Sequence, residues 1–405
     1  MNLPKAPVLA ARATWPDNGA MPAPARAAAP RKNEIVAAAD LRPFQARLLG
    51  WYAAAKRDLD WRATHDPYRV WISEIMLQQT RVAAVVPYYR RFLERFPTVS
   101  DLAGARTDAV LRHWAGLGYY GRARNLHRAA KEIVARHRGE FPRLLEGALA
   151  LPGIGGYTAA AVLSIAYGAP HAVLDGNVAR VLARLGAIRG DLRRPRRWRS
   201  LNAAADALLP AAPETTPRAG PAATPGDWNQ AMMELGATVC TPRAPQCGAC
   251  PVSRWCRAHA LGMALRLPSP RRKPKPVRLA LSAAVLFDPR GRTLVVRQKS
   301  GHSALFSNLW HFPAVQSEAP APEKLAAYLR SEFGITAALE PLPEARHTVT
   351  FRRLLLAPYL VRVPRLPRPK SLTTGAAHTP RLADLGRLPI SSATKKIAAS
   401  ARTRA

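Results

Sequence analysis

The sequence predicts a mostly α-helical domain followed by a smaller α+β domain, and three observations support this prediction. Residues 38–190 repeat apolar side chains at helical spacing, with glycine or proline between the segments and no alternating strand pattern. A basic, proline-rich stretch at 262–277 then interrupts the chain, as a linker does. Beyond it the pattern changes to that of strands, and a chain of 405 residues is long enough for two domains of ordinary size.

In the first domain, one helix has clear start signals. Pro67 suits a first helical position, where its missing N–H would have no partner, and Asp66 is placed to cap the helix. Residues 191–226 are rich in Pro, Arg and Ala, and we expect mostly a surface insertion there, with one short helix near 201–209. Further helices are expected around 108–114, 122–137, 158–167 and 178–186, and from 227 into the cysteines.

The second domain is expected to mix strands and helix. Two strands, at 280–287 and 293–297, are separated by Asp-Pro-Arg-Gly-Arg, which predicts a hairpin. A helix at 322–333 and strands near 347–363 complete the pattern. The predicted organisation is a disordered Ala- and Pro-rich extension at 1–36, the helical domain at 37–261 with a cysteine loop at 240–256, the linker at 262–277 and the second domain at 278–400.

The charge of the chain indicates a polyanionic partner. Lys and Arg number 61 against 26 Asp and Glu, which gives a formal net charge of +35. Nucleic acid is the expected partner and an acidic membrane surface the alternative. A generally arginine-rich proteome would also explain part of the excess. No apolar run reaches the roughly 18 residues of a membrane span, and the N-terminus lacks the pattern of a secretory signal.

Four cysteines gather within 17 residues. Cys240, Cys247, Cys250 and Cys256 are separated by six, two and five residues. This is unlike a disulfide framework spread over a secreted fold, so an intracellular, reducing compartment is expected. Tetrathiolate zinc sites usually use two distant Cys-x-x-Cys pairs, whereas here one pair is flanked by single cysteines. The spacing therefore favours an iron–sulfur cluster over zinc, with four unrelated buried thiols as the remaining alternative.

A glycine-rich turn at 151–157 separates two helical segments. Its glycines let the backbone turn tightly and approach a ligand closely. The amides at the start of the following helix then form an anion site, and in a basic chain a DNA phosphate is the natural anion. A Gly-x-Gly turn is also common between helices that bind nothing, which is the alternative.

Two carboxylates are expected in different environments. Glu74 lies inside a strongly apolar helix, where burial would raise its pKa and keep it protonated. Asp175 follows an apolar stretch and precedes a helix, where a capping carboxylate stays ionised. One neutral acid and one ionised carboxylate are what glycosidic cleavage needs. A solvent-facing Glu and a purely capping Asp are the alternatives.

Together these features resemble the helix-hairpin-helix superfamily of base-excision glycosylases, and within it the MutY adenine DNA glycosylases. The resemblance covers about 38–260 strongly and 278–400 weakly. It is carried by WISEIMLQQT at 71–80, WAGLGYY at 114–120, LPGIG at 151–155, VLDGNV at 173–178, NQAMMELG at 229–236 and the cysteine spacing.

The resemblance implies a monofunctional glycosylase that flips adenine out of double-stranded DNA, opposite 8-oxoguanine or guanine, and hydrolyses its N-glycosidic bond. It implies that Glu74 protonates the adenine ring and then helps to activate water. Asp175 would stabilise the sugar cation or bond to it transiently. The other implied roles are Tyr157 and Asn177 as catalytic pocket residues, Arg62 near the flipped adenine, Gln79 and Tyr119 entering the duplex, Gly153 and Gly155 contacting the DNA backbone, and Cys240, Cys247, Cys250 and Cys256 as ligands of one [4Fe-4S] cluster.

Tyr157 separates this chain from a related branch. The endonuclease III branch has a lysine at this position, whose amine attacks the sugar and leads to strand cleavage. No lysine stands in the hairpin here, so a hydrolase is favoured over a glycosylase/lyase for oxidised pyrimidines. A basic DNA-binding protein with an inactive pocket is the second rival, and the presence of both Glu74 and Asp175 argues against it.

The second domain resembles the MutY C-terminal module, which has a Nudix-like fold and senses oxidised guanine. LWHFP at 309–313 and RHT at 346–348 support this, and only a fragment of the Nudix metal box remains at 329–334, so no nucleotide hydrolysis is expected. His347 and Thr350 are the implied DNA contacts, although the family commonly has Phe-Ser-His where this chain has Val-Thr-Phe. With DNA as its partner, the protein is expected to be a cytoplasmic, nucleoid-associated monomer.

Overall fold

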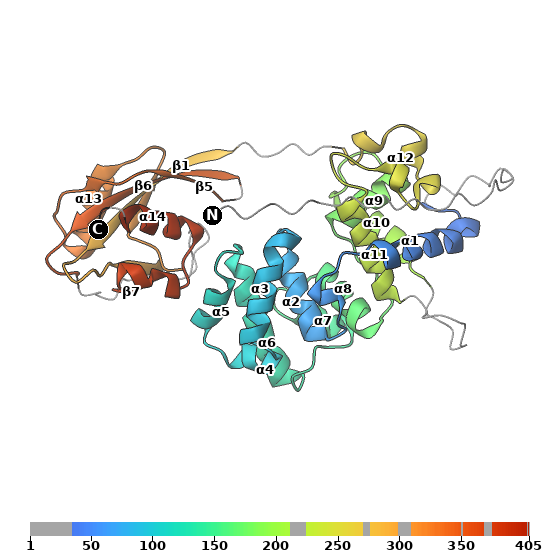
Figure 1. Cartoon of the computed structure of the whole chain (residues 1–405), viewed down its shortest axis with the longest axis horizontal. Helices are drawn as coiled ribbons and strands as arrows, with labels where there is room; N and C mark the ends of the chain where they lie inside the picture. The colour runs from blue at the N-terminus through green and yellow to red at the C-terminus, as the bar shows by residue number, and fades with distance from the viewer. Residues whose placement is uncertain are drawn as a thin grey trace, which may run out of the picture.

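The structure, a computed structural model, describes residues 35–210, 224–269, 276–298, 309–349, 351–367, 375–402 and 404. They form a helical domain followed by a smaller domain built on a β-sheet, so the predicted fold class is confirmed (Figure 1). The extension predicted at 1–36 lies outside the described residues up to residue 34. Ile35 and Val36 are buried in the helical core, so the first domain begins before residue 37. Among the helices described, none has the length and apolarity to cross a membrane.

The helices of the first domain form two groups (Figure 1). Helices α2 to α8 lie together, and α1 lies with α9 to α12. Packing of α8 on α2 and on α11 joins the two groups. The bounds are α1 Leu41–Ala55, α2 Pro67–Leu77, α3 Val82–Arg95, α4 Val99–Gly104, α5 Thr107–Trp114, α6 Tyr120–Arg136, α7 Leu145–Ala150, α8 Gly156–Tyr167, α9 Gly176–Leu185, α10 Pro195–Ala207, α11 Pro225–Thr238 and α12 Arg257–Ala260.

The start of α2 follows from its capping residues, as the sequence predicts. The Asp66 carboxylate accepts hydrogen bonds from the amides of Tyr68 and Arg69, and Pro67 fills the first helical position. Along α2 almost every residue from Tyr68 to Met76 is buried. The helix therefore carries its polar residues into the domain interior, Glu74 among them.

The segment predicted as a surface insertion contains a packed helix. α10 is longer than the helix predicted near 201–209, and it buries Leu201 and Ala205 while packing on α9. Its arginines obscured the helical pattern in the sequence, but they lie on the exposed side of the helix. Residues 211–223 of the predicted insertion lie outside the described residues.

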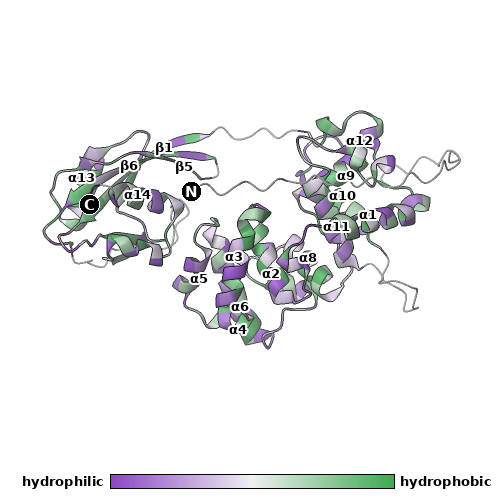
Figure 2. Cartoon of the chain, in the orientation of Figure 1, coloured by the Kyte–Doolittle hydropathy of each residue, from purple (hydrophilic) through white to green (hydrophobic). Residues whose placement is uncertain are grey.

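The core of the first domain is rich in large aromatic side chains. Trp71, Trp114 and Trp228 are fully buried, and Phe44 packs edge-on against Trp228 with ring centroids 5.9 Å apart. Figure 2 shows hydrophobic and hydrophilic residues alternating along α3 and α6, as expected for helices with one buried face.

The second domain is a mixed sheet with a helix on each side. The strand order is β3-β1-β6-β4, β5 also pairs with β6, and only β1 and β6 run parallel among these pairs. Alternate residues of β1 enter two separate apolar clusters, one formed with α14 and the other with α13. The bounds are β1 Val277–Phe287, β2 Val295–Gln298, β3 Ala314–Ser317, α13 Pro322–Phe333, β4 Glu340–Pro341, β5 Ala345–Val349, β6 Arg352–Arg362, β7 Gly375–His378 and α14 Ser392–Arg402.

The hairpin predicted between 280–287 and 293–297 forms only next to its turn, where Phe287 and Thr293 make an isolated antiparallel bridge. The turn itself forms, because the amide of Gly291 donates to the carbonyl of Asp288. However, β2 pairs with β7 in a separate two-stranded sheet, whereas β1 pairs with β3 and β6. Turn residues set where the chain reverses, but partners distant in sequence set which strands pair. The predicted helix at 322–333 is α13, and the predicted strands near 347–363 are β5 and β6.

In the described part of the chain, hydrogen bonds and an ion pair join the two domains. The Tyr120 hydroxyl donates to the carbonyl oxygen of Ile390 at 3.0 Å. The Arg297 guanidinium pairs with the Asp108 carboxylate at 2.6 Å and also lies 4.6 Å from the ring centroid of Trp310. The second domain thus contacts the residue next to Tyr119.

Candidate active site and cysteine loop

All four predicted catalytic residues line one cavity of about 570 Å³, together with the predicted DNA contacts Arg62, Gln79 and Gly155. Glu74 comes from α2, Tyr157 from α8, and Asp175 and Asn177 from the start of α9. Glu234 of α11 lines the same cavity. The two carboxylates, 101 positions apart in the sequence, therefore face a common space large enough for a nucleobase.

Glu74 is a buried carboxyl with one strong hydrogen-bond donor. Only 5 % of the residue is exposed, and the Tyr157 hydroxyl donates to its Oε2 at 2.7 Å. Burial raises the pKa of Glu74 to about 7, and the nearby Asp175 adds to the rise, while Tyr157 and Arg62 oppose it. At neutral pH a large fraction of Glu74 therefore carries a proton.

Asp175 caps α9 with its Oδ1 atom, and its Oδ2 atom accepts from the Asn177 side chain. It accepts the amides of Asn177 at 2.9 Å and Val178 at 2.7 Å, and the Asn177 side-chain amide at 2.9 Å. Burial raises its pKa above the ordinary value, but these hydrogen bonds and Arg180 lower it. Among the described residues, Tyr157 gives Glu74 its one side-chain hydrogen bond, whereas Asp175 accepts three. This difference favours the proton on Glu74 and the charge on Asp175.

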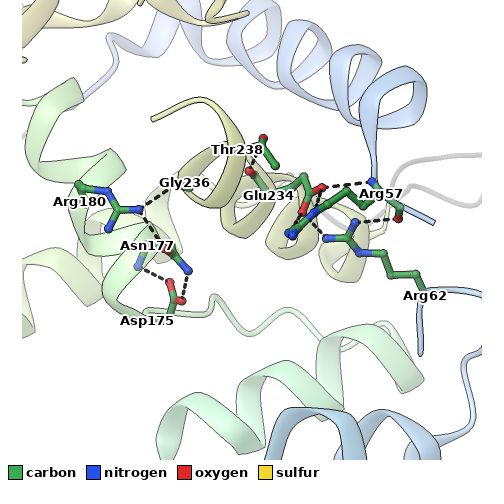
Figure 3. A network of polar contacts seen from close by, with 8 residues as sticks. All are labelled: Arg57, Arg62, Asp175, Asn177, Arg180, Glu234, Gly236 and Thr238. Atoms are coloured by element: carbon green, nitrogen blue, oxygen red, sulfur yellow. Dashed lines mark hydrogen bonds and ion pairs between the residues drawn. The ribbon is translucent and has the colours of Figure 1, made fainter. Parts of the chain in front are cut away.

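Arg180 bonds to Asn177, the partner of this carboxylate, and also reaches the cysteine loop. Its Nη2 donates to Asn177 Oδ1 at 2.8 Å and to the carbonyl of Gly236 at 2.7 Å (Figure 3). Its Nε donates to the carbonyl of Cys240 at 2.8 Å. Arg180 was not among the site residues predicted from the sequence. Its position one turn after Asn177 on an apolar helix was the available signal.

Arg62 is held by a second network on α11 (Figure 3). Its Nη2 lies 2.6 Å from Glu234 Oε2, and Arg57 reaches the same carboxylate at 2.6 Å. Although burial opposes it, hydrogen bonds from the two arginines hold the pKa of Glu234 at about 2. Glu234 and Arg57 were missed because they stand more than 170 positions apart. A glutamate amid apolar residues of the 229–236 motif was the only hint.

The two residues predicted to enter a duplex share an uncommon backbone conformation. Gln79 has φ of 56° and Tyr119 has φ of 48°, in the left-handed region that non-glycine residues rarely adopt. Both side chains are exposed, Tyr119 by 45 %. Such backbone strain persists only where the surroundings enforce it, and it clusters at functional positions.

The glycine turn needs its first glycine. Gly153 has φ of 79°, and a Cβ there would lie 2.6 Å from Asn125 Cβ, so the position admits no side chain. Gly155 has no such crowding and precedes the first residue of α8. Both are exposed, which leaves the turn and the following amides open to a ligand.

In the second domain, His347 lies on β5 opposite Leu354 of β6 and is half-buried. Burial, together with Lys396, lowers its pKa. Thr350 lies outside the described residues. The neighbouring Phe351 is 43 % exposed.

The cysteine loop has the donors of a metal centre. Cys240, Cys247, Cys250 and Cys256 are half-buried, and burial together with the three other thiols raises the pKa of Cys250 to about 12. The buried Arg184 donates to Cys240 Sγ at 3.2 Å. In the described part of the chain, no three His, Cys, Asp or Glu side chains converge on a single-ion site. Four cysteines in one loop supply the thiolate donors that hold iron–sulfur clusters, so the donor set fits a four-iron cluster.

Comparison with known proteins shows which families this chain is similar to. Residues 72–203 match the HhH-GPD superfamily of base excision DNA repair proteins. The adenine DNA glycosylase of Rattus norvegicus is 37 % identical over 354 residues, covering 75 % of this chain and 66 % of that protein. That of Mycolicibacterium smegmatis is 45 % identical over 216 residues, covering 53 % of this chain and 69 % of that protein. The structure of a MutT NUDIX hydrolase from Burkholderia pseudomallei aligns with 30 % of this chain and 97 % of that chain. The two are 19 % identical in sequence, and the TM-score is 0.26.

The fold and the site are those of the helix-hairpin-helix class that residues 72–203 match. Within that class, the chain belongs to the adenine DNA glycosylase family. The aligned part covers 66 % of the length of the rat protein and 40 % of the length of the Homo sapiens protein. The chain therefore spans less than two thirds of the length of these relatives.

Proposed function

We propose that this protein is a monofunctional adenine DNA glycosylase that hydrolyses adenine mispaired with 8-oxoguanine or guanine. The observation that carries the proposal is the pairing in one cavity of a buried Glu74, with a pKa of about 7, and an Asp175 held by three hydrogen bonds. This is the acid and carboxylate pair that cleavage of a glycosidic bond requires.

In the proposed reaction, Glu74 gives its proton to a ring nitrogen of the flipped adenine, and the C1′–N9 bond breaks with its electron pair passing to the base. The sugar is left as a cation, which the Asp175 carboxylate stabilises. The Glu74 carboxylate then removes a proton from a water molecule as the water oxygen bonds to C1′. The products are free adenine and an abasic site, and Glu74 is protonated again.

Monofunctional hydrolysis is favoured by the cavity lining. A lyase needs an amine that can attack C1′ and form a Schiff base. Among the described residues that line this cavity there is no lysine, and its two arginines are held in ion pairs with Glu234. Tyr157, at the position of the lyase lysine, instead donates its hydroxyl hydrogen to Glu74.

The DNA-binding surface in this proposal combines the turn glycines and the two exposed loop residues. The amides after Gly155 would bind a backbone phosphate, while Gln79 and Tyr119 would fill the space left by the flipped adenine. The formal net charge of +35 supplies the long-range attraction to DNA. His347 and Thr350 of the second domain are the proposed contacts near the base opposite the adenine. A protein with this substrate works where the chromosomal DNA is, in the cytoplasm as a nucleoid-associated monomer.

The four cysteines are proposed to hold one [4Fe-4S] cluster. When bound, the cluster would crosslink the loop at 240–256 and fix its basic surface against DNA. Arg184 supports this role, because its guanidinium donates to Cys240 Sγ and to the carbonyl oxygens of Cys240 and Thr241. The resulting loop is then joined to the Asp175 pocket through Arg180.

A strand-cleavage assay tests the monofunctional part of the proposal. End-labelled duplexes with adenine opposite 8-oxoguanine, guanine or thymine are incubated with excess enzyme, with and without alkali. We expect breaks only after alkali and only in the first two duplexes, since an abasic site is alkali-labile and thymine is the correct partner. Breaks without alkali would reject hydrolysis in favour of lyase chemistry.

A further inference from the structure

Arg122, at the start of α6, joins three segments that carry site residues. Its Nη1 donates to the carbonyl oxygens of Ile75 at 2.7 Å, Met76 at 2.9 Å and Gln78 at 2.5 Å. These carbonyls lie at the C-terminal end of α2, where a helix leaves acceptors without intrahelical donors. One turn earlier on the same helix stands Glu74.

The other amino group of Arg122 reaches the two exposed loops. Nη2 donates to Thr80 Oγ1 at 3.2 Å, beside Gln79, and to the carbonyls of Leu117 and Gly118 at 3.4 Å, immediately before Tyr119. The guanidinium also lies 5.4 Å from the ring centroid of Tyr119. One planar group is therefore bonded to the two loops that hold Gln79 and Tyr119 in the left-handed conformation.

The chemistry of these contacts is unusual for an arginine. The hydrogen-bond partners of both terminal nitrogens are neutral oxygens, and burial lowers the pKa of Arg122 to about 10. Its Nε is buried without a hydrogen-bond partner among the described residues. Burying the Arg122 charge with only backbone and hydroxyl oxygens as partners costs free energy. A role in holding the two loops in their strained conformation accounts for the buried arginine.

We infer that Arg122 is a positioning residue for base extrusion. It fixes the positions of Gln79 and Tyr119 relative to the helix that carries Glu74, so that the two side chains enter the duplex beside the catalytic pocket. This inference rests on the proposed function and deepens it. Only a fork of donors fits the arrangement, because arginine presents five N–H groups in a plane and lysine presents three from one nitrogen. Arg122→Lys therefore keeps the charge and loses the geometry.

The test compares two duplexes under single-turnover conditions. In one, the adenine lies opposite 8-oxoguanine, and in the other opposite an abasic-site analogue, so that extrusion breaks no base pair. For Arg122→Lys we expect a roughly 100-fold slower release from the paired duplex, the loss that a misplacement of about 1 Å produces. From the unpaired duplex we expect a loss below about tenfold. Arg136→Lys, an exposed position on the same helix, is the matched control and should be unaffected.

A double-substitution cycle separates positioning from general structure. If Arg122 acts through Tyr119, adding Arg122→Lys to Tyr119→Ala slows release by less than about threefold. Equal losses on both duplexes, or fully multiplicative effects in the cycle, would overturn the inference. If Arg122→Lys does not fold, Thr80→Val serves instead, because valine has nearly the shape of threonine but removes one hydrogen-bond acceptor of Arg122. We expect a smaller loss of rate, confined to the paired duplex. An equal loss on both duplexes would again overturn the inference.

A fluorescence measurement distinguishes this inference from the proposed function. If the wild-type protein releases no adenine from any duplex, the proposed function has failed. The role of Arg122 is then still measured with 2-aminopurine at the target position, whose fluorescence rises when the base leaves the stack. Arg122→Lys is expected to bind the duplex with a smaller rise than wild type. An equal rise would overturn the inference.

Discussion

Replacing Glu74 with glutamine should make the protein more stable at alkaline pH while it abolishes base release. The amide keeps an acceptor oxygen for the Tyr157 hydroxyl, which donates to Glu74 at 2.7 Å, and it fills nearly the same volume. It cannot ionise, however. In the wild-type protein, ionisation of Glu74 places a charge in a site where only 5 % of the residue is exposed.

The magnitude follows from the raised pKa. The pKa of Glu74 rises from 4.5 in the unfolded chain to about 7 in the folded protein. Between these two pH values the unfolded chain has lost the proton and the folded protein keeps it, so wild-type stability falls as pH rises. Above about pH 7 the full effect, about 3 kcal/mol, has been lost, and below about pH 4.5 none of it has. Any fixed cost of burying the amide does not depend on pH.

The assay is urea unfolding of both proteins at a series of pH values from about 4 to about 8.5. The unfolding free energy of Glu74→Gln minus that of wild type should grow by about 3 kcal/mol across this range and level off above about pH 7. A difference that stays constant with pH would refute the buried, proton-binding Glu74 on which the proposed acid catalysis rests.

Three further changes test other parts of the structure. Tyr157→Phe removes a hydrogen bond that lowers the pKa of Glu74, so the alkaline fall in single-turnover release should move above about pH 7; an unchanged midpoint would contradict this. Cys250→Ser should reduce the iron in anaerobically purified protein from about four per chain to near zero, and wild-type protein without iron would remove the cluster from the account. Asp108→Arg should separate the domains and raise the radius of gyration in solution scattering, and adding Arg297→Asp should restore it. Failure of the double swap to restore it would show that this ion pair does not hold the domains together.

The sequence was sufficient where local pattern and local structure agree. Asp66 and Pro67 marked the start of α2 because capping depends on neighbours two or three residues away. The apolar residues around Glu74 likewise predicted its burial, which the structure has. The helix at 322–333 was also correct, since its apolar spacing had no competing interpretation.

Features that depend on distant partners could not be derived in the same way. Glu234 looked like any glutamate on a helix until the fold placed Arg57 and Arg62 against it. β2 paired with β7 rather than β1, although the intervening turn had typical hairpin residues. Arg122 was missed for the same reason, because its acceptors are backbone carbonyls that no side-chain pattern reveals.

The central claim is that the cavity of Glu74 and Asp175 releases adenine by hydrolysis, and direct detection of the released base tests it most simply. A duplex with adenine opposite 8-oxoguanine is incubated with wild-type protein, Glu74→Gln and Asp175→Asn, and free adenine is measured by chromatography. The account predicts about one adenine per enzyme-bound duplex for wild type and none above background for either variant. Release by Glu74→Gln at the wild-type rate, or no release by an iron-loaded, folded wild-type protein, would contradict it.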